Sequence, residues 1–310
     1  MHVLVLGSGA GGGVPQWNCG CPQCDAARAG DPNLRTRTQS SIAVSADGRR
    51  WVLLNASPDV RAQLAANPAL HPKSLRHSPI EAVALTNADI DHCLGLMILR
   101  EGGAPPIYAT ARTGRALREG LRILPALEAY GEVRFREVAL DAEVRFADRA
   151  GVPLGVVGRP FAVASKPPPY MLPLLDAREA ADDLAGDTVA WVLSDAAGAS
   201  VVYVPGVKAL DARLREEIAR ASAVLIDGTF LTDDEMIALG ASPKTARVMG
   251  HAPLSGDEGI VEFLASIPGP RKILLHINNS NPILWERGPQ RAWLASRGVE
   301  VAVDGMDLEV

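Results

Sequence analysis

The sequence of 310 residues lacks several features that would define a class of protein. Aromatic residues make up only 5%, and the 31 Lys and Arg are outnumbered by 36 Asp and Glu, for a formal net charge of −5. Nucleic-acid-binding domains usually carry excess positive charge, so the sequence argues against that partner. No apolar run approaches the roughly 20 residues of a membrane span. Because the chain opens on a strand-like apolar run rather than a basic leader, we expect a cytoplasmic protein without a membrane partner.

Cysteine is also scarce, with four residues in the chain. Disulfides are rare in cytoplasmic proteins, so these residues need another role. Cys19, Cys21 and Cys24 form the pattern C-x-C-x₂-C, a knuckle at about residues 17–25 that suits a tetrahedral zinc ion with a fourth ligand from elsewhere. Three unrelated thiols are the alternative, although thiols so close together would oxidise readily. Cys93 offers a fourth thiolate for an iron–sulfur cluster, but we favour it as a small core residue.

Apolar residues make up 47% of the chain and form short runs between Gly, Pro, Asn and Asp. This pattern predicts mostly strands in the first two-thirds and alternating helices and strands at both ends. We expect strands at residues 2–9, 40–45, 49–57, 80–87, 105–110, 135–140, 153–163, 188–195, 200–207, 223–230 and 271–278, and a strand or hairpin at 299–310. We expect helices at residues 59–70, 111–124, 211–222, 256–267 and 289–298. Without repeats, linkers or charge blocks, the chain is predicted to be one α/β domain over residues 1–310.

The glycine-rich start fits the dinucleotide fingerprint G-x-G-x-x-G through Gly7, Gly9 and Gly12. That fingerprint requires a helix directly after it, because the phosphate binds at the helix N-terminus. Pro15 and the residues that follow it oppose such a helix. We therefore expect no nicotinamide or flavin cofactor, and interpret the glycines as tight turns at a strand end.

A proline-rich segment, KPPPYMLP, occupies residues 166–173. Consecutive prolines favour a stiff, extended chain. The segment is therefore predicted to be a surface connector or, alternatively, a rigid wall over a substrate pocket.

Several segments together resemble one known family. They are the glycine-rich first strand, the C-x-C-x₂-C pattern, TNADIDH at 86–92, IDGTF at 226–230, MGHAPLSG at 249–256 and LLHINNSNPIL at 274–284. The combination is similar to the metallo-β-lactamase superfamily over nearly the whole chain, and within it to the branch that takes part in making pyrroloquinoline quinone (PQQ). The resemblance implies an α/β fold of the αββα sandwich type, with metals bound at the strand ends between two sheets.

The resemblance also implies that one of the superfamily's two metal sites is lost. Hydrolytic members carry H-x-H-x-D-H on the turn that is TNADIDH here, and the first two His bind one of the metals. Asn87 and Asp89 replace them, and an amide is a poor ligand for a divalent transition metal. Gly206 stands where the bridging aspartate is expected, and no His lies near residues 166–170 to serve as the third ligand.

The second site is retained through Asp91, His92 and His276. One carboxylate and two imidazoles form the facial triad that holds Fe(II) and leaves positions open for dioxygen and substrate. Zinc accepts the same ligands, so the metal stays undecided. Taken alone, Asp91 and His92 would indicate a helix cap with a surface His, and His276 a core residue.

Two further assignments follow from relatives. Asp227 and His251 match segments that flank the active site in tRNA-processing members, so we predict general acid–base catalysis or substrate binding, with a purely structural hydrogen bond as the alternative. In a phosphodiesterase relative with the same cysteine pattern, the fourth zinc ligand lies three residues after the last active-site His. Counting from His276 gives Asn279, whose carbonyl oxygen would complete the zinc site and tie the first loop to the active-site loop.

The function that the resemblance implies is a step in making PQQ from a ribosomal peptide whose Glu and Tyr become cross-linked. Our first hypothesis is a mononuclear non-haem iron hydroxylase that acts with dioxygen on a tyrosine-derived peptide or small-molecule precursor. The alternatives are a zinc-dependent hydrolase and a non-catalytic PQQ carrier or transport factor. A homodimer is compatible with the sequence.

Overall fold

The computed structural model describes residues 1–101, 103–180 and 185–310, and in this part of the chain the strands form two seven-stranded sheets. The first sheet has the order β14 (Asp307–Glu309), β1 (His2–Gly7), β2 (Ser41–Ser45), β3 (Trp51–Leu54), β4 (Ile80–Ala84), β5 (Ile107–Ala109) and β6 (Phe135–Glu137). The second has the order β13 (Val299–Val301), β12 (Arg271–Leu275), β11 (Ala223–Asp227), β10 (Ser200–Val204), β9 (Val189–Asp195), β8 (Pro153–Ala162) and β7 (Val144–Ala147).

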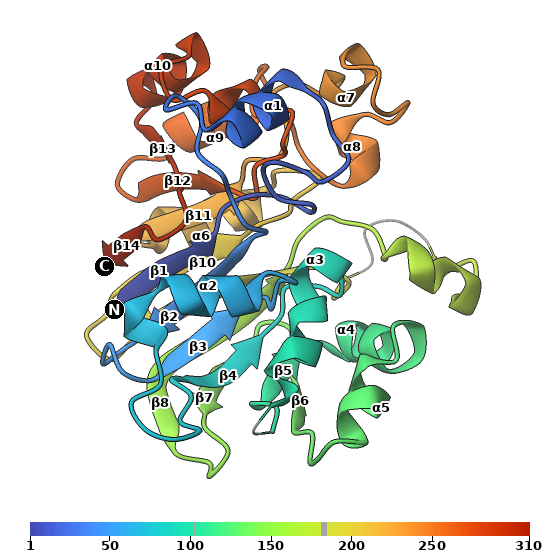
Figure 1. Ribbon diagram of the computed structural model, residues 1–310, viewed down its shortest axis with the longest axis vertical. Helices are drawn as coiled ribbons and strands as arrows, with labels where there is room; N and C mark the ends of the chain where they lie inside the picture. The colour runs from blue at the N-terminus through green and yellow to red at the C-terminus, as the bar shows by residue number, and fades with distance from the viewer. Residues whose placement is uncertain (102, 181–184) are drawn as a thin grey trace.

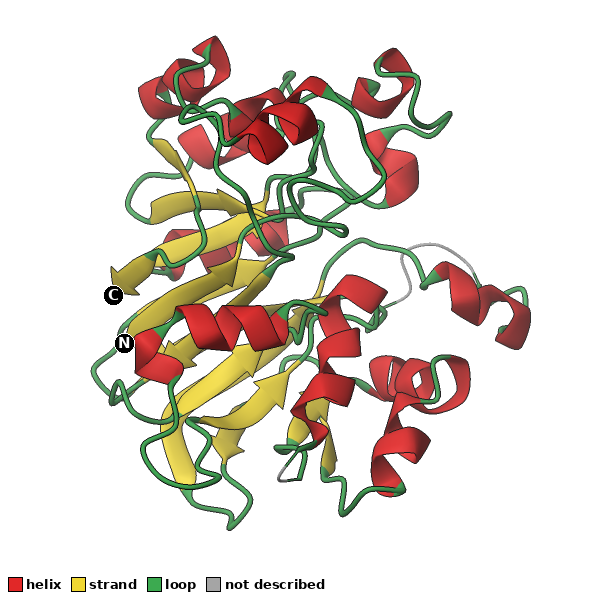
Figure 2. Ribbon diagram, viewed as in Figure 1, coloured by secondary structure: helices red, strands yellow, loops and turns green. Residues whose placement is uncertain are grey.

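The two sheets pack face to face, and helices cover the outer face of each (Figures 1 and 2). One buried cluster, which includes Val5 of β1 and Leu225 of β11, fills the space between the sheets. On the first sheet the outer helices are α2 (Val60–Ala66), η1 (Pro68–Leu70), α3 (Ile90–Cys93), η2 (Leu94–Arg100), α4 (Ala111–Arg115), η3 (Ala116–Gly120) and α5 (Ile123–Glu128). On the second they are α1 (Pro22–Ala29), α6 (Ala212–Arg220), α9 (Ile260–Ala265), η5 (Pro282–Leu284) and α10 (Pro289–Ser296). The αββα sandwich predicted from the sequence is confirmed.

Parallel strand pairs determine where the functional residues gather. β3 and β4 are parallel in the first sheet, and β10 to β13 are parallel in the second. Residues 86–92 follow the carboxyl end of β4, Asp227 ends β11, and His276 directly follows β12. Because carboxyl ends of parallel strands meet at one edge, these segments lie at a common rim between the sheets.

Three sequence predictions can be compared with the fold. β2 and β3 lie within the strands expected at residues 40–45 and 49–57, and they pair as antiparallel neighbours. The closing segment is not a hairpin, since β13 pairs with β12 in one sheet and β14 with β1 in the other. The proline-rich segment is only partly extended, because residues Pro169–Leu174 form the 3₁₀ helix η4. Proline is well accommodated at the start of a helix, where its missing N–H has no partner to lose.

Two short helices, α7 (Glu235–Ala238) and α8 (Ala246–Met249), lie in the chain between β11 and α9. Within the described residues, no helix has both the length and the apolar character that crossing a bilayer requires.

Candidate metal centre

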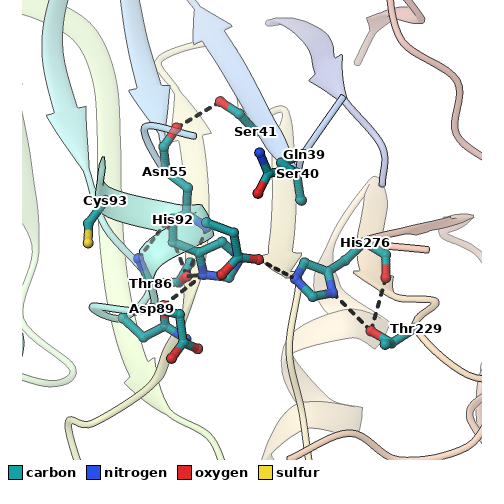
Figure 3. A network of polar contacts seen from close by, with 12 residues as sticks. Gln39, Ser40, Ser41, Asn55, Thr86, Asp89, His92, Cys93, Thr229 and His276 are labelled. Atoms are coloured by element: carbon teal, nitrogen blue, oxygen red, sulfur yellow. Dashed lines mark hydrogen bonds and ion pairs between the residues drawn. The ribbon is translucent and has the colours of Figure 1, made fainter. Parts of the chain in front are cut away.

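Three predicted ligands converge from the two sheets. Asp91 and His92 lie on the first turn of α3, and His276 lies opposite them at the end of β12. One ligand atom from each residue lies within 4.8 Å of the other two. The Asp91 Oδ2 atom is 3.2 Å from His276 Nε2 and 3.7 Å from His92 Nε2. Figure 3 shows His92 beside Thr86 and His276 beside Thr229, on opposite sides of the centre.

The surroundings of the three residues fit a cation. His92 Nε2 is buried and, among the described atoms, has no hydrogen-bond partner. Burial lowers the pKa of His92 to about 4, so its imidazole is neutral and able to bind a metal at neutral pH. Burial opposes ionisation of Asp91, but the neighbouring His92 and His276 outweigh it and hold its pKa well below the usual range. For His276, burial lowers the pKa, yet Asp91, Asp227 and Asp89 raise it overall.

Backbone geometry brings the ligands close. His276 has a φ of 58°, in the left-handed region that non-glycine residues rarely adopt, and such residues concentrate at functional sites. A side chain at Gly11 would begin 3.4 Å from Asp91 Oδ2, so the glycine-rich loop after β1 packs directly against this carboxylate. A Cβ at Gly7 would clash with a backbone oxygen, and Gly12 has a φ of 92°, so these glycines serve close packing and turns, in agreement with their interpretation from the sequence.

The centre opens into a cleft of about 940 Å³. The residues that line it include all three predicted ligands, and the others are Ala10, Gly11, Asn87, Asp89, Ser165, Lys166, Pro167, Pro169, Thr188, Gly206, Thr229, Phe230, Met249, Gly250, His251 and Asn278. Part of the proline-rich segment thus forms a wall of the cleft, which was one of its two predicted roles. A metal with open coordination positions would be accessible to a substrate here.

The positions expected for a second metal do not form a ligand set. Asn87 donates through Nδ2 to Asp89 Oδ2 at 2.8 Å, and its Oδ1 atom lies 2.7 Å from His92 Nδ1. Asp89 belongs to no group of three His, Cys, Asp or Glu side chains, within the described ranges, that lie close enough to hold an ion. Burial and the nearby Asp91 raise the pKa of Asp89 to about 6. Gly206 lies beside His251, with no side chain to bridge two metals.

Asp227 and His251 form the predicted pair. The His251 Nδ1 atom lies 2.7 Å from Asp227 Oδ2, and the His251 ring stacks on His276 at a centroid distance of 5.3 Å. Burial opposes ionisation of Asp227, but His251 and His276 outweigh it and lower its pKa. The backbone N–H of Val207 also donates to this carboxylate at 2.9 Å. His251 lines the cleft, so the pair is placed to exchange a proton with a bound molecule.

The three cysteines of the first loop form a second, more enclosed cluster. Their sulfur atoms lie within 4.8 Å of one another, and Cys21 and Cys24 are buried. The Asn279 Nδ2 atom donates to all three sulfurs, at 3.1 Å to Cys19 Sγ, 3.5 Å to Cys21 Sγ and 3.3 Å to Cys24 Sγ. Burial opposes ionisation of Cys21, but a backbone N–H and neighbouring side chains outweigh it and lower its pKa. Asn279, the residue predicted to supply the fourth ligand, therefore lies beside the three thiols, with its amide nitrogen directed at them.

Cys93 lies apart from this cluster. It is buried in the outer core of the first sheet, and its thiol contacts the Ala88 carbonyl oxygen. Among the described residues the cysteine cluster contains three thiols, so Cys93 is a core residue and not a cluster ligand.

Sequence reasoning missed Thr229 and the contacts of Asn87. The Thr229 hydroxyl lies within 2.9 Å of His276 Nδ1 and 2.6 Å of Asp227 Oδ1. The only available signal was its position two residues after Asp227 in IDGTF. Asn87 was identified as a missing metal ligand, but no pattern showed that its side chain contacts His92.

The fold and the site define the class of the protein. A family model described as a β-lactamase superfamily domain matches residues 50–277, so the chain belongs to that superfamily. A crystal structure of Zn²⁺-bound PqqB from Methylobacterium extorquens matches with a TM-score of 0.90 at 44% identity, covering 100% of both chains. Coenzyme PQQ synthesis protein B is 43% identical over 313 residues in Methylorubrum populi and 46% identical over 314 residues in Azoarcus sp., with 100% of each chain covered. The chain is a member of the coenzyme PQQ synthesis protein B family.

More distant structures share the fold alone. A diphosphatase from the PhnP family matches with a TM-score of 0.65 at 20% identity, covering 100% of this chain and 96% of that one.

Proposed function

We propose that this protein takes part in PQQ biosynthesis as a mononuclear non-haem iron hydroxylase of a tyrosine-derived precursor. The observation that carries the proposal is the set of Asp91, His92 and His276 at the floor of an open cleft. This set has the composition of a 2-His-1-carboxylate triad, whose remaining coordination positions are open. The assignment to PQQ biosynthesis rests on the names of the relatives.

Fe(II) at this site would supply the activation of dioxygen. Ring hydroxylation consumes one dioxygen, two electrons from an external donor and two protons. One oxygen atom forms the new C–O bond, and the other leaves as water.

The protein's own groups position the reactants and handle protons. His251 Nδ1–H donates a hydrogen bond to Asp227. His251 Nε2 then faces the cleft, where it can accept or donate a proton. Pro167 and Pro169 wall one side of the cleft and help to exclude water from the bound precursor. The precursor itself is either a peptide or a small molecule.

A separate zinc ion is proposed for Cys19, Cys21, Cys24 and Asn279. Three thiolates and an amide oxygen give four ligands, as structural zinc requires. Zinc binding would then turn the Asn279 amide over, so that its oxygen and not its nitrogen faces the ion. Asn279 and His276 lie on the same loop, so this zinc would hold the loop that presents His276.

Electron paramagnetic resonance of the anaerobic Fe(II) protein exposed to nitric oxide tests the hydroxylase. We expect a half-integer high-spin iron–nitrosyl signal that is lost in Asp91→Ala and His276→Ala. The same signal in both variants would place the iron elsewhere and refute the proposal.

A zinc-dependent hydrolase is the second candidate, favoured by the Zn²⁺ bound to the relative from Methylobacterium extorquens. Metal-activated water would then attack a peptide or ester bond. Turnover that survives exchange of iron for zinc under argon would favour the hydrolase. Tight binding of PQQ without turnover with either metal would instead indicate a carrier.

A further inference from the structure

The two histidine ligands share a feature on the side that faces away from the centre. Each Nδ1 atom contacts a side-chain oxygen of a residue that follows a strand on the same side of the sandwich. We propose that Asn87 and Thr229 are positioning residues that hold His92 and His276 in the Nδ1–H form, with both Nε2 atoms directed at the metal. The inference rests on the proposed metal centre and assigns a role to two residues that bind no metal themselves.

For His92, the backbone determines which atom of the Asn87 amide is the oxygen. The N–H of Asp89 donates to Asn87 Oδ1 at 3.1 Å, and Asn87 Nδ2 donates to the Asp89 carboxylate at 2.8 Å. A backbone N–H can only donate and a carboxylate can only accept, so the amide has one consistent orientation. His92 Nδ1 lies 2.7 Å from the same Oδ1 atom and must therefore carry a proton. The neutral imidazole then has its lone pair on Nε2, the atom without a partner among the described residues.

Another neighbour of His92 cannot replace Asn87. The hydroxyl of Thr86 lies 3.4 Å from His92 Nδ1, near the limit of a hydrogen bond. Asn55 Oδ1 accepts from the backbone N–H of Thr86 at 2.9 Å and lies 3.1 Å from its hydroxyl (Figure 3). Asn55 and Thr86 thus brace the segment, while Asn87 makes the short contact to the ring.

For His276, the single hydroxyl proton of Thr229 decides the tautomer. The Thr229 Oγ1 atom lies 2.6 Å from Asp227 Oδ1 and 2.9 Å from the His276 carbonyl oxygen, and both of these atoms only accept. The proton therefore goes to an oxygen, and Oγ1 accepts at its 2.9 Å contact with His276 Nδ1. His276 accordingly carries a proton on Nδ1 and presents Nε2 to the centre. Asp227, buried and negatively charged, is the endpoint of this chain of hydrogen bonds.

The arrangement orients both rings from the side that faces away from the metal, whereas on the other side His92 Nε2 has no partner among the described atoms and His276 Nε2 lies 3.2 Å from Asp91 Oδ2. Metal-bound His usually donates its other ring N–H to an acceptor, and loss of such an acceptor costs about 10–100-fold in metal affinity. Here the acceptors come from the turn after β4 and from the segment after β11. Position 87, where a metal-binding imidazole was expected, supplies an oxygen that orients a neighbouring imidazole.

The experiment compares the wild type with Asn87→Leu and Thr229→Val, which keep side-chain size but remove the acceptor. Asn87→Gln, which keeps the amide, and Thr229→Ser, which keeps the hydroxyl, are the matched controls. Two-bond ¹H–¹⁵N correlation spectra of the metal-free protein, labelled only at its six His residues, report each ring's tautomer directly. Competition of Co(II) against a chelator gives the metal affinity of the same proteins, and circular dichroism checks their folding.

We expect a proton on Nδ1 of both rings in the wild type and in the two controls. In Asn87→Leu the His92 ring should become a mixture of tautomers, in Thr229→Val the His276 ring should do so, and Co(II) binding should weaken about 10–100-fold in each. Folded Leu and Val variants with unchanged tautomers and Co(II) affinity within about twofold of the wild type would overturn the proposal. Tautomers that change as expected in a protein that binds no Co(II) at this centre would support the positioning roles and count against the proposed metal function.

Discussion

Among the described residues, the cysteine cluster and the Asp/His cluster have the chemistry of metal ligands and share no residue, while a further group, Asp227, His251 and His276, shares His276 with the Asp/His cluster. The cysteine cluster and the Asp/His cluster differ in the chain separation of their ligands and in their exposure to solvent. The cysteine cluster draws its thiols from residues 19–24 and is covered by Asn279. The Asp/His cluster draws its ligands from positions up to 185 residues apart and opens into a cleft of about 940 Å³. Closed four-ligand sites are typical of structural zinc, and open three-ligand sites are typical of catalysis.

The two clusters are nevertheless joined by one short loop. His276 belongs to the open cluster, and Asn279 contacts the closed one. The left-handed backbone at His276 requires support from its surroundings, and the closed cluster lies three residues away. We therefore propose that the open cluster carries the chemistry and that the closed cluster maintains the backbone that presents His276.

The largest expected effect comes from Asp91→Asn, which removes the carboxylate of the open cluster at constant size. The variant should lose the metal of this cluster and roughly 1000-fold or more of its activity, because the metal supplies several kcal/mol of stabilisation to the transition state. Elemental analysis should still find one zinc per chain at the cysteine cluster. Loss of both metals would show that zinc binding at the cysteine cluster depends on the metal of the Asp/His cluster.

Cys21→Ser is the converse change at the closed cluster. We expect the zinc to be lost and the free energy of unfolding to fall by about 4 kcal/mol, the value for an ion present at about 1000 times its dissociation constant. Denaturant titration with and without added zinc measures the difference. The matched control is Cys93→Ser, which removes a buried thiol outside the cluster, so its stability should respond to zinc as the wild type does. A full zinc response in Cys21→Ser, or its loss in Cys93→Ser, would contradict the assignment.

The comparison also shows which features a sequence makes visible. Cys19, Cys21 and Cys24 are close in the chain, and Asp91 and His92 are adjacent, so local spacing is enough to identify them. His276 and Asp227 come together because β11 and β12 are parallel neighbours, a pairing that no local pattern reports. They were predicted from the family resemblance and not from the residues alone.

The roles of Asn87 and Thr229 lay beyond the sequence for a related reason. A hydrogen bond from a ring nitrogen depends on side-chain orientation, which a pattern of residue types does not determine. The ending of the chain gave a similar difficulty, since residues 299–310 have the alternation of a hairpin. Only the three-dimensional arrangement assigns β13 to one sheet and β14 to the other.

A smaller effect is expected from changes at Asn279, the residue that would couple the clusters. Asn279→Ala should weaken zinc binding at the closed cluster about 10–100-fold, as removal of a supporting group does. Asn279→Asp should bind zinc at least as tightly as the wild type, because a carboxylate is a good zinc ligand. Competition with a chromophoric chelator measures both affinities. Equal affinities in all three proteins would show that the amide is a neighbour of the zinc and not its ligand.

The smallest effect concerns the wall of the open cluster. The Tyr170 hydroxyl donates to the Ala88 carbonyl oxygen at 2.5 Å, which fixes the proline-rich segment to the turn that carries Asp91. Tyr170→Phe removes this hydrogen bond, worth about 1 kcal/mol, without changing the ring. We expect an increase in KM of about fivefold with little change in kcat, since the wall positions the precursor and takes no part in the chemistry. Tyr130→Phe, at an exposed site on the helical side of the first sheet, is the control and should leave both constants unchanged. A fall in kcat in Tyr170→Phe with KM unchanged would mean that the wall supports the metal ligands rather than the substrate.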